Sequence, residues 1–236
     1  MLKMETVSKH YHHRGQLVKA LDSVDLTVGK GEFVSVVGPS GSGKSTLLLT
    51  LGGMLTPSAG SVWLDDRSLY DMAPDERARA RRQRIGFVFQ TFNLVPYLTA
   101  LENVQVPLML AHVDESSQGR VAVSLLERVG LAERVNHKPS ELSVGQQQRV
   151  ALARMLANNP EVVLADEPTG SLDPDTTCEI TEFLAALNAE GKTIVMVTHN
   201  HDTAARAKRT LWLVDGRVHP EKPKKESHGA KCPAQR

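Results

Sequence analysis

A glycine-rich segment at residues 38–46, GPSGSGKST, has residue types and spacing that could hold phosphate groups. It matches the pattern G-x-x-x-x-G-K-[ST], between the apolar run FVSVV and a helix-like stretch. Its glycines let the backbone curl so that N–H groups face an anion. Lys44 would attract the β- and γ-phosphates, and the Ser45 hydroxyl would bind Mg²⁺. We therefore expect ATP to contact this P-loop, which consists of Gly38, Pro39, Ser40, Gly41, Ser42, Gly43, Lys44, Ser45 and Thr46.

Two acidic residues follow a second apolar run, VVLA at residues 162–165. Asp166 is the expected metal carboxylate, which would hold Mg²⁺ directly or through water. Glu167 would then face the γ-phosphate and act as a general base on the attacking water. Many strands end in acids at a turn, so this pattern is weak alone. Together with the P-loop it indicates a site of ATP hydrolysis.

Two further apolar runs are also followed by polar residues. Gln90 follows IGFVF, and His199 follows TIVMVT. Ligands of open α/β sheets bind at the carboxyl ends of the strands. We expect Gln90 to contact both Mg²⁺ and the attacking water, and His199 to contact the γ-phosphate or orient the water. A lone histidine is more often a structural or surface residue, but the strand-end position favours a functional role.

The segment KHYHHRG at residues 9–15 contains three histidines and Tyr11. A metal site would need a matching second cluster of ligands, which the sequence does not show, so we do not favour one. Tyr11 is more useful as an aromatic platform for a purine ring.

The elements that must position these groups alternate between strand-like and helix-like segments. Four β-branched-rich runs are typical of strands buried on both faces of a parallel sheet: 33–37, 85–89, 162–165 and 193–197. Helices are predicted at 46–51, 75–82, 146–157 and 176–190. This alternation predicts an α/β fold. The more alternating early segments predict an antiparallel β layer, and residues 91–142 a small α-helical subdomain.

Composition excludes several other classes of protein. The 236 residues carry a net charge of +1, so no overall field attracts nucleic acid. No apolar run approaches the ~20 residues of a membrane-spanning helix, and the first residues lack a signal peptide's apolar region. We therefore expect a cytoplasmic protein. Cys178 and Cys232 lie far apart and predict neither a disulfide framework nor a zinc site. Residues 219–236 read as a flexible basic tail, with weak attraction to an anionic membrane as the alternative.

The segment ELSVGQQQRVA at residues 141–151 contains no obvious nucleophile or metal ligand, yet it reads as a helix start. Ser143 is a good N-cap, and Gln146 completes a capping-box pattern. A helix N-terminus attracts anions. The P-loop already fills one side of the nucleotide, so a second such end would be redundant within one site. We expect it to complete the site of another copy of the chain.

These motifs occur in the order and spacing of the ATP-binding-cassette (ABC) ATPases, which residues 1–218 resemble. The resemblance implies a P-loop NTPase (RecA-like) core, about 1–90 and 143–218, with a mainly parallel sheet. It also implies a head-to-tail homodimer that sandwiches two ATP molecules. In such a dimer Ser143, Gly145 and Gln146 reach the partner's ATP, Ser171 and Asp173 cross the dimer seam, and Tyr11 stacks on adenine.

The segment 142–146, LSVGQ, departs from the usual LSGGQ because Val144 replaces a glycine. A β-branched residue cannot easily take a positive φ, so we expect a working site whose kinetics could differ. Asn200 also stands where an aspartate commonly follows the histidine.

The stretches FQTFNLVPYLTALENVQVPLMLA and ADEPTGSLD most resemble the macrolide-exporter, lipoprotein-releasing and cell-division ABC ATPases. This similarity implies a membrane permease subunit as partner and a peripheral position on the inner face of the cell membrane. The permease would dock on an apolar surface, although each of its residues could instead belong to the core of the helical subdomain. This surface comprises Phe92, Leu94, Val95, Pro96, Tyr97 and Leu98.

Three other functions are weighed against export or mechanotransmission. The ATPase of an importer would carry the same motifs. A soluble ABC protein acting on nucleic acid or ribosomes usually has two cassettes or a coiled-coil insertion, and this chain has neither pattern. A non-hydrolysing interaction module is disfavoured by the intact Lys44, Asp166, Glu167 and His199.

Overall fold

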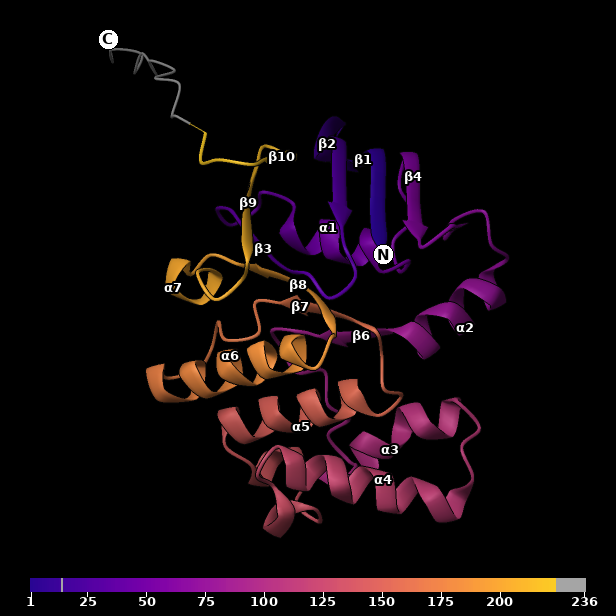
Figure 1. Ribbon diagram of the computed structural model, residues 1–236, viewed down its shortest axis with the longest axis vertical. Helices are drawn as coiled ribbons and strands as arrows, with labels where there is room; N and C mark the ends of the chain where they lie inside the picture. The colour runs from indigo at the N-terminus through magenta and orange to yellow at the C-terminus, as the bar shows by residue number, and fades with distance from the viewer. Residues whose placement is uncertain (14, 224–236) are drawn as a thin grey trace.

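The computed structural model describes residues 1–13 and 15–223, and a mainly parallel central sheet runs through it (Figure 1). Its six strands have the order β10-β9-β3-β8-β7-β6. All neighbouring strands pair in parallel except β10 and β9. The strands are β3 (Phe33–Val37), β6 (Ile85–Val88), β7 (Val162–Asp166), β8 (Thr193–Thr198), β9 (Arg209–Val214) and β10 (Arg217–His219).

A second, antiparallel sheet packs over α1 on one side of the central sheet. Its order is β2-β1-β4-β5. The inward residues of β2 alternate with exposed ones, which explains why the early sequence alternates. Helix α1 (Lys44–Leu51) contacts both sheets. The antiparallel strands are β1 (Leu2–His13), β2 (Gln16–Val28), β4 (Ala59–Leu64) and β5 (Arg67–Ser68).

Helices cover the other side of the central sheet (Figure 1). Helix α5 contacts both α3 and α4, so the second core is continuous from the sheet into the helical region. The predicted division near residues 91 and 142 therefore stays a prediction. The helical elements besides α1 are α2 (Pro74–Arg84), α3 (Ala100–Leu110), α4 (Glu115–Arg128), η1 (Ala132–Arg134), η2 (Pro139–Glu141), α5 (Val144–Leu156), α6 (Pro174–Ala189) and α7 (His201–Ala204).

The α/β fold is confirmed, with the predicted strands and helices displaced by at most a few residues at their ends. Within the described ranges 1–13 and 15–223, no helix has both the length and the apolar character needed to cross a membrane. Residues 224–236 of the predicted tail, including Cys232, lie outside the described residues.

Candidate functional site

The P-loop follows β3 and leads into α1. Gly43 has φ +102°, and a side chain there would collide with the Ala20 carbonyl oxygen. Among the described residues no side chain caps α1, so its first N–H groups stay available to an anion. The glycine is therefore needed both for the backbone conformation and for the close approach of β2.

Lys44 is 8% exposed, and its charge is directed into the P-loop. Its Nζ donates to the carbonyl oxygens of Gly38 at 2.9 Å and Pro39 at 3.0 Å. The same nitrogen lies 3.6 Å from Glu167 Oε1. The P-loop and the end of β7 therefore meet at this ammonium group.

Glu167 has an unusual backbone and a fixed carboxylate. Its φ is +45°, a region that non-glycine residues occupy with strain, and it is 9% exposed. Its Oε2 accepts a 3.2 Å bond from the backbone N–H of His199 and lies 2.9 Å from His199 Nδ1. The carboxylate therefore sits between the Lys44 ammonium and the His199 ring.

Ser45 of the P-loop and Asp166 at the end of β7 each offer an oxygen atom to a metal ion. Burial raises the pKa of Asp166, and a hydrogen bond with Ser45 opposes this rise. Within the described chain, Asp166 Oδ1 is buried and has no hydrogen-bond partner. A carboxylate oxygen and a neighbouring hydroxyl are ligands that Mg²⁺ takes, so these residues fit a magnesium ion.

Gln90 follows β6 at the same edge of the sheet, because β6 and β7 are parallel neighbours. It is exposed and borders the loop after Glu167, since a Cβ placed on Gly170 would lie 3.1 Å from Gln90 Nε2. The structure thus brings together the P-loop, Gln90, the β7 acids and His199.

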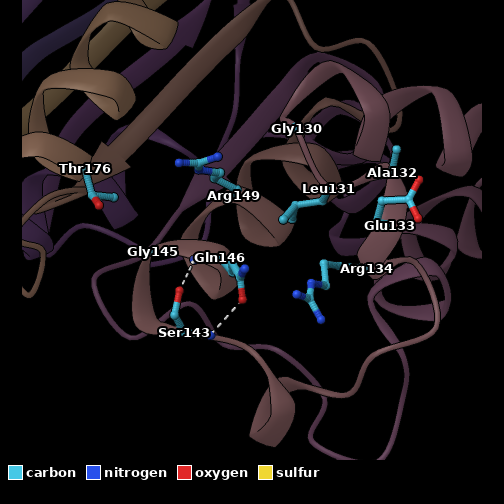
Figure 2. A pocket seen from close by; sticks show the side chains of 10 residues that line it. All are labelled: Gly130, Leu131, Ala132, Glu133, Arg134, Ser143, Gly145, Gln146, Arg149 and Thr176. Atoms are coloured by element: carbon cyan, nitrogen blue, oxygen red, sulfur yellow. Dashed lines mark hydrogen bonds between the residues drawn. The ribbon is translucent and has the colours of Figure 1, made fainter.

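The start of α5 lines a separate pocket of about 410 Å³ (Figure 2). Ser143 Oγ accepts from the Gln146 backbone N–H at 3.2 Å, and Gln146 Oε1 accepts from the Ser143 N–H at 2.9 Å. The predicted capping box is therefore present. None of the described lining residues comes from the P-loop or the ends of β6, β7 and β8: the pocket comprises Gly130, Leu131, Ala132, Glu133, Arg134, Ser143, Gly145, Gln146, Arg149 and Thr176.

The two unusual residues of this family pattern fit without strain. Val144 is the first residue of α5, its φ is not positive, and its side chain is 46% exposed. The conformational difficulty expected of a valine therefore does not arise. Asn200 is the N-cap of α7, where its Oδ1 accepts from the N–H groups of Asp202 and Thr203.

Asp173 caps α6, with Oδ1 accepting from Thr176 N at 3.0 Å and Oδ2 from Thr176 Oγ1 at 2.7 Å. Ser171 is exposed two residues earlier. Asp173 thus stabilises the start of α6 within the single chain. Its place at a dimer seam stays a prediction.

Tyr11 is exposed on β1, and Lys9 Nζ lies 5.4 Å from its ring centroid. Tyr11 pairs in register with the exposed Val18 of β2, so both side chains share one face. The sequence analysis did not identify Lys9 and Val18 as neighbours of Tyr11. The alternation of side chains along β1 and β2 could have indicated that they share its face.

A groove of about 520 Å³ lies among β6, α2, α3 and α5. Of the segment 92–98, only Asn93 lines it, so none of the six predicted residues does. Tyr97 among them is 82% exposed. The predicted surface thus flanks a groove that other residues line. These are Met54, Ala78, Arg81, Arg82, Ile85, Gly86, Phe87, Phe89, Val106, Pro107, Leu110, Arg154, Met155, Asn158 and Pro160.

Comparison with known proteins adds three findings. The family described as ABC transporter matches residues 21–170. The chain is 47% identical over 226 residues to an uncharacterised ABC transporter ATP-binding protein, MJ0796, of Methanocaldococcus jannaschii, which covers 94% of this chain and 96% of that protein. It is 44% identical over 218 residues to the macrolide export ATP-binding/permease protein MacB of Escherichia coli, which covers 92% of this chain and 34% of MacB. The chain thus spans about a third of MacB.

Two solved structures of MJ0796 share this fold. One is a dimeric structure of the cassette, with a TM-score of 0.88 and 46% identity. The other is a dimeric post-hydrolysis state bound to ADP and Pi, with a TM-score of 0.87 and 45% identity. Each match covers 92% of this chain and 96% of the solved chain.

Proposed function

The chain belongs to the ABC transporter family as an ATP-binding, ATP-hydrolysing protein, and we propose that it drives export or mechanotransmission through a separate membrane subunit. The observation that supports ATP hydrolysis as the energy source is the Glu167 carboxylate, held between Lys44 and His199 beside the P-loop. The similarity to MacB favours export. An importer ATPase is the alternative.

In this proposal each strand end has a task in ATP hydrolysis. The P-loop N–H groups bind the phosphates, and Lys44 exchanges its loop carbonyl partners for phosphate oxygens. Ser45, Asp166 and Gln90 would hold Mg²⁺, which would neutralise charge on the phosphates when bound. Glu167 takes a proton from the water whose oxygen bonds to the γ-phosphorus as the bond to ADP breaks. His199 holds this carboxylate and contacts the γ-phosphate, and Tyr11 stacks on adenine.

A second copy of the chain completes each site. The start of α5 lies in a pocket whose lining does not include Glu167, which supports the proposal that one chain has two different nucleotide-binding surfaces. The dimeric structures of MJ0796 support a homodimer, and the head-to-tail arrangement is part of our proposal. There Ser143, Gly145 and Gln146 contact the partner's ATP, and Ser171 and Asp173 lie at the seam.

The groove among β6, α2, α3 and α5 is the proposed docking site of the membrane permease. Its described lining is apolar apart from three arginines and a few amides, and it includes no acidic residue. Arg82 Nε is buried without a hydrogen-bond partner among the described residues. An amphipathic helix with a carboxylate on its apolar face would fit this groove. Docking of the permease in this groove would hold the ATPase on the inner face of the membrane. We propose no nucleic-acid partner.

The proposal is tested by finding the partner. Tagged Glu167→Gln would be expressed, membranes solubilised with ATP and Mg²⁺, and the co-purifying proteins identified. We expect a permease with few transmembrane helices and a large extracytoplasmic domain. A many-helix permease would favour the importer alternative. A ribosomal partner with nothing from the membrane would overturn the transport proposal.

Two arginine variants locate the docking site in the same experiment. Arg82→Glu, which reverses a charge in the groove, should abolish co-purification. Arg79→Glu is the matched control, because Arg79 lies exposed on α2 and does not line the groove. Equal recovery with both variants would place the permease elsewhere.

A further inference from the structure

Gln148 is a fully buried polar residue in the middle of α5, with 0% of its surface exposed. Its Nε2 donates a 2.6 Å hydrogen bond to the carbonyl oxygen of Pro168. Pro168 follows Glu167 directly, so the side chain ties α5 to the catalytic loop. The two segments are 20 residues apart in the sequence.

Three consecutive glutamines therefore have three different tasks. Gln146 closes the capping box with Ser143. Gln147 Nε2 donates to the Leu142 carbonyl oxygen at 3.0 Å, within the segment that leads into the helix. Of these three glutamines, Gln148 alone has a side-chain hydrogen bond from α5 to the loop after β7.

Folding stability alone does not explain a glutamine at this position. Gln148 Oε1 is buried and accepts no hydrogen bond from the described residues. A buried polar atom without a partner costs free energy, so the unpaired Oε1 offsets much of what the single bond to Pro168 contributes to folding. Polar groups that break this rule are concentrated at functional sites.

The Pro168 carbonyl is a suitable point from which to control Glu167. Glu167 is held in its strained conformation by bonds from its own N–H to Val197 O and from Gly170 N–H to its carbonyl oxygen. Such a conformation persists only where its surroundings fix it. The bond from Gln148 fixes the next peptide unit from the α5 side.

We propose that Gln148 is a positioning residue for ATP hydrolysis, which acts through Pro168 on the carboxylate of Glu167. The inference rests on the proposed role of Glu167 as general base. Helix α5 would then act on two ATP molecules. Its Ser143 end contacts the ATP of the partner, and its Gln148 side chain positions the Glu167 carboxylate that acts on the ATP of the same chain.

The test compares Gln148→Met with Gln147→Met. Methionine keeps the length and removes the donor, and Gln147→Met removes a similar bond from the neighbouring residue. Gln148→Met should lower kcat by about tenfold or more, because a displaced catalytic group costs that much in rate. The KM for ATP and nucleotide binding should stay within about twofold of wild type. Gln147→Met should leave kcat within about twofold.

Two further readouts separate positioning from a general structural defect. In the Glu167→Gln background, adding Gln148→Met should lower the residual turnover by less than about twofold, because both changes act through one carboxylate. ATP-dependent dimerisation in that background should be unchanged, since Ser143 and Gly145 are intact. Thermal unfolding confirms that each variant is folded, and Gln148→Leu replaces Gln148→Met if the latter does not fold.

Wild-type kcat in a folded Gln148 variant would overturn the inference. So would an undiminished effect of Gln148→Met in the Glu167→Gln background. Absence of ATP hydrolysis by the wild-type protein at concentrations where it dimerises with ATP would instead refute the proposed function itself.

Discussion

Gly145→Ala tests whether the glycine of the signature segment is needed for space or for backbone conformation. Gly145 lies in the first turn of α5, and its φ is not positive. An added Cβ would lie 2.8 Å from Thr176 Cγ2 and 3.3 Å from Thr176 Oγ1. Thr176 cannot turn away freely, because its hydroxyl and N–H both bond to Asp173. The requirement is therefore for space beside α6.

The expected loss of stability follows from two opposing terms. Overpacking a fitted contact costs about 1–3 kcal/mol. Replacing a helical glycine by alanine returns about 0.5–1 kcal/mol. The net loss is about 1 kcal/mol, which lowers the Tm of a domain of this size by about 2–4 °C. ATP turnover should fall by more than the loss of stability explains, because the new methyl group lies beside the N–H groups proposed to face the partner's ATP.

The assay is urea unfolding together with ATP turnover for Gly145→Ala, Thr176→Ser and the double variant. Thr176→Ser removes Cγ2 but keeps the hydroxyl that bonds to Asp173. The double variant should recover most of the lost stability and little of the lost turnover. A Gly145→Ala protein as stable as wild type, or a double variant no more stable than Gly145→Ala, would refute the steric reasoning.

Substitutions at Gly43 and Val144, with Gly41 as a control, test other parts of the site. Gly43→Ala should cost about 3 kcal/mol or more in urea unfolding, because the new side chain needs a strained φ and collides with Ala20; Gly41→Ala, with a positive φ but open space, should cost only about 1–2 kcal/mol. Equal losses would show that the collision with β2 does not matter. Val144→Gly should lower stability by about 0.5 kcal/mol and change kcat by less than about threefold, since Val144 already has helical backbone; a tenfold change in kcat in a steady-state assay would contradict this.

The local motifs of the site could be predicted from sequence, because each depends on a short segment and the strand before it. The P-loop, the acids after β7 and the Ser143 capping box are of this kind. The expectation that Val144 is strained was wrong. It took the glycine usual at this position to need a positive φ, but the backbone of Val144 is helical. The distinct role of Gln148 could not be predicted, since three adjacent glutamines differ only in the direction that α5 gives each side chain.

The lining of the proposed docking groove also could not be predicted from the sequence. It combines side chains of α2, β6, α3 and α5, which meet only when the sheet and helices are packed. Within the segment 92–98, the predicted residues at 92 and 94–98 are apolar and interrupted only by Asn93, which is why they stood out. Its carbonyl groups at Phe92 and Asn93 accept hydrogen bonds from Arg154, so the loop forms a border of the groove.

The separation of the α5 pocket from Glu167 has a consequence for how the protein works in dilute solution. If each complete site needs parts of two chains, the rate at low concentration should grow with the square of the protein concentration. Doubling the protein would then raise the rate about fourfold, until dimers predominate. A membrane subunit that binds two copies would raise their effective concentration. The permease would then switch on hydrolysis simply by bringing two chains together, without touching either catalytic centre.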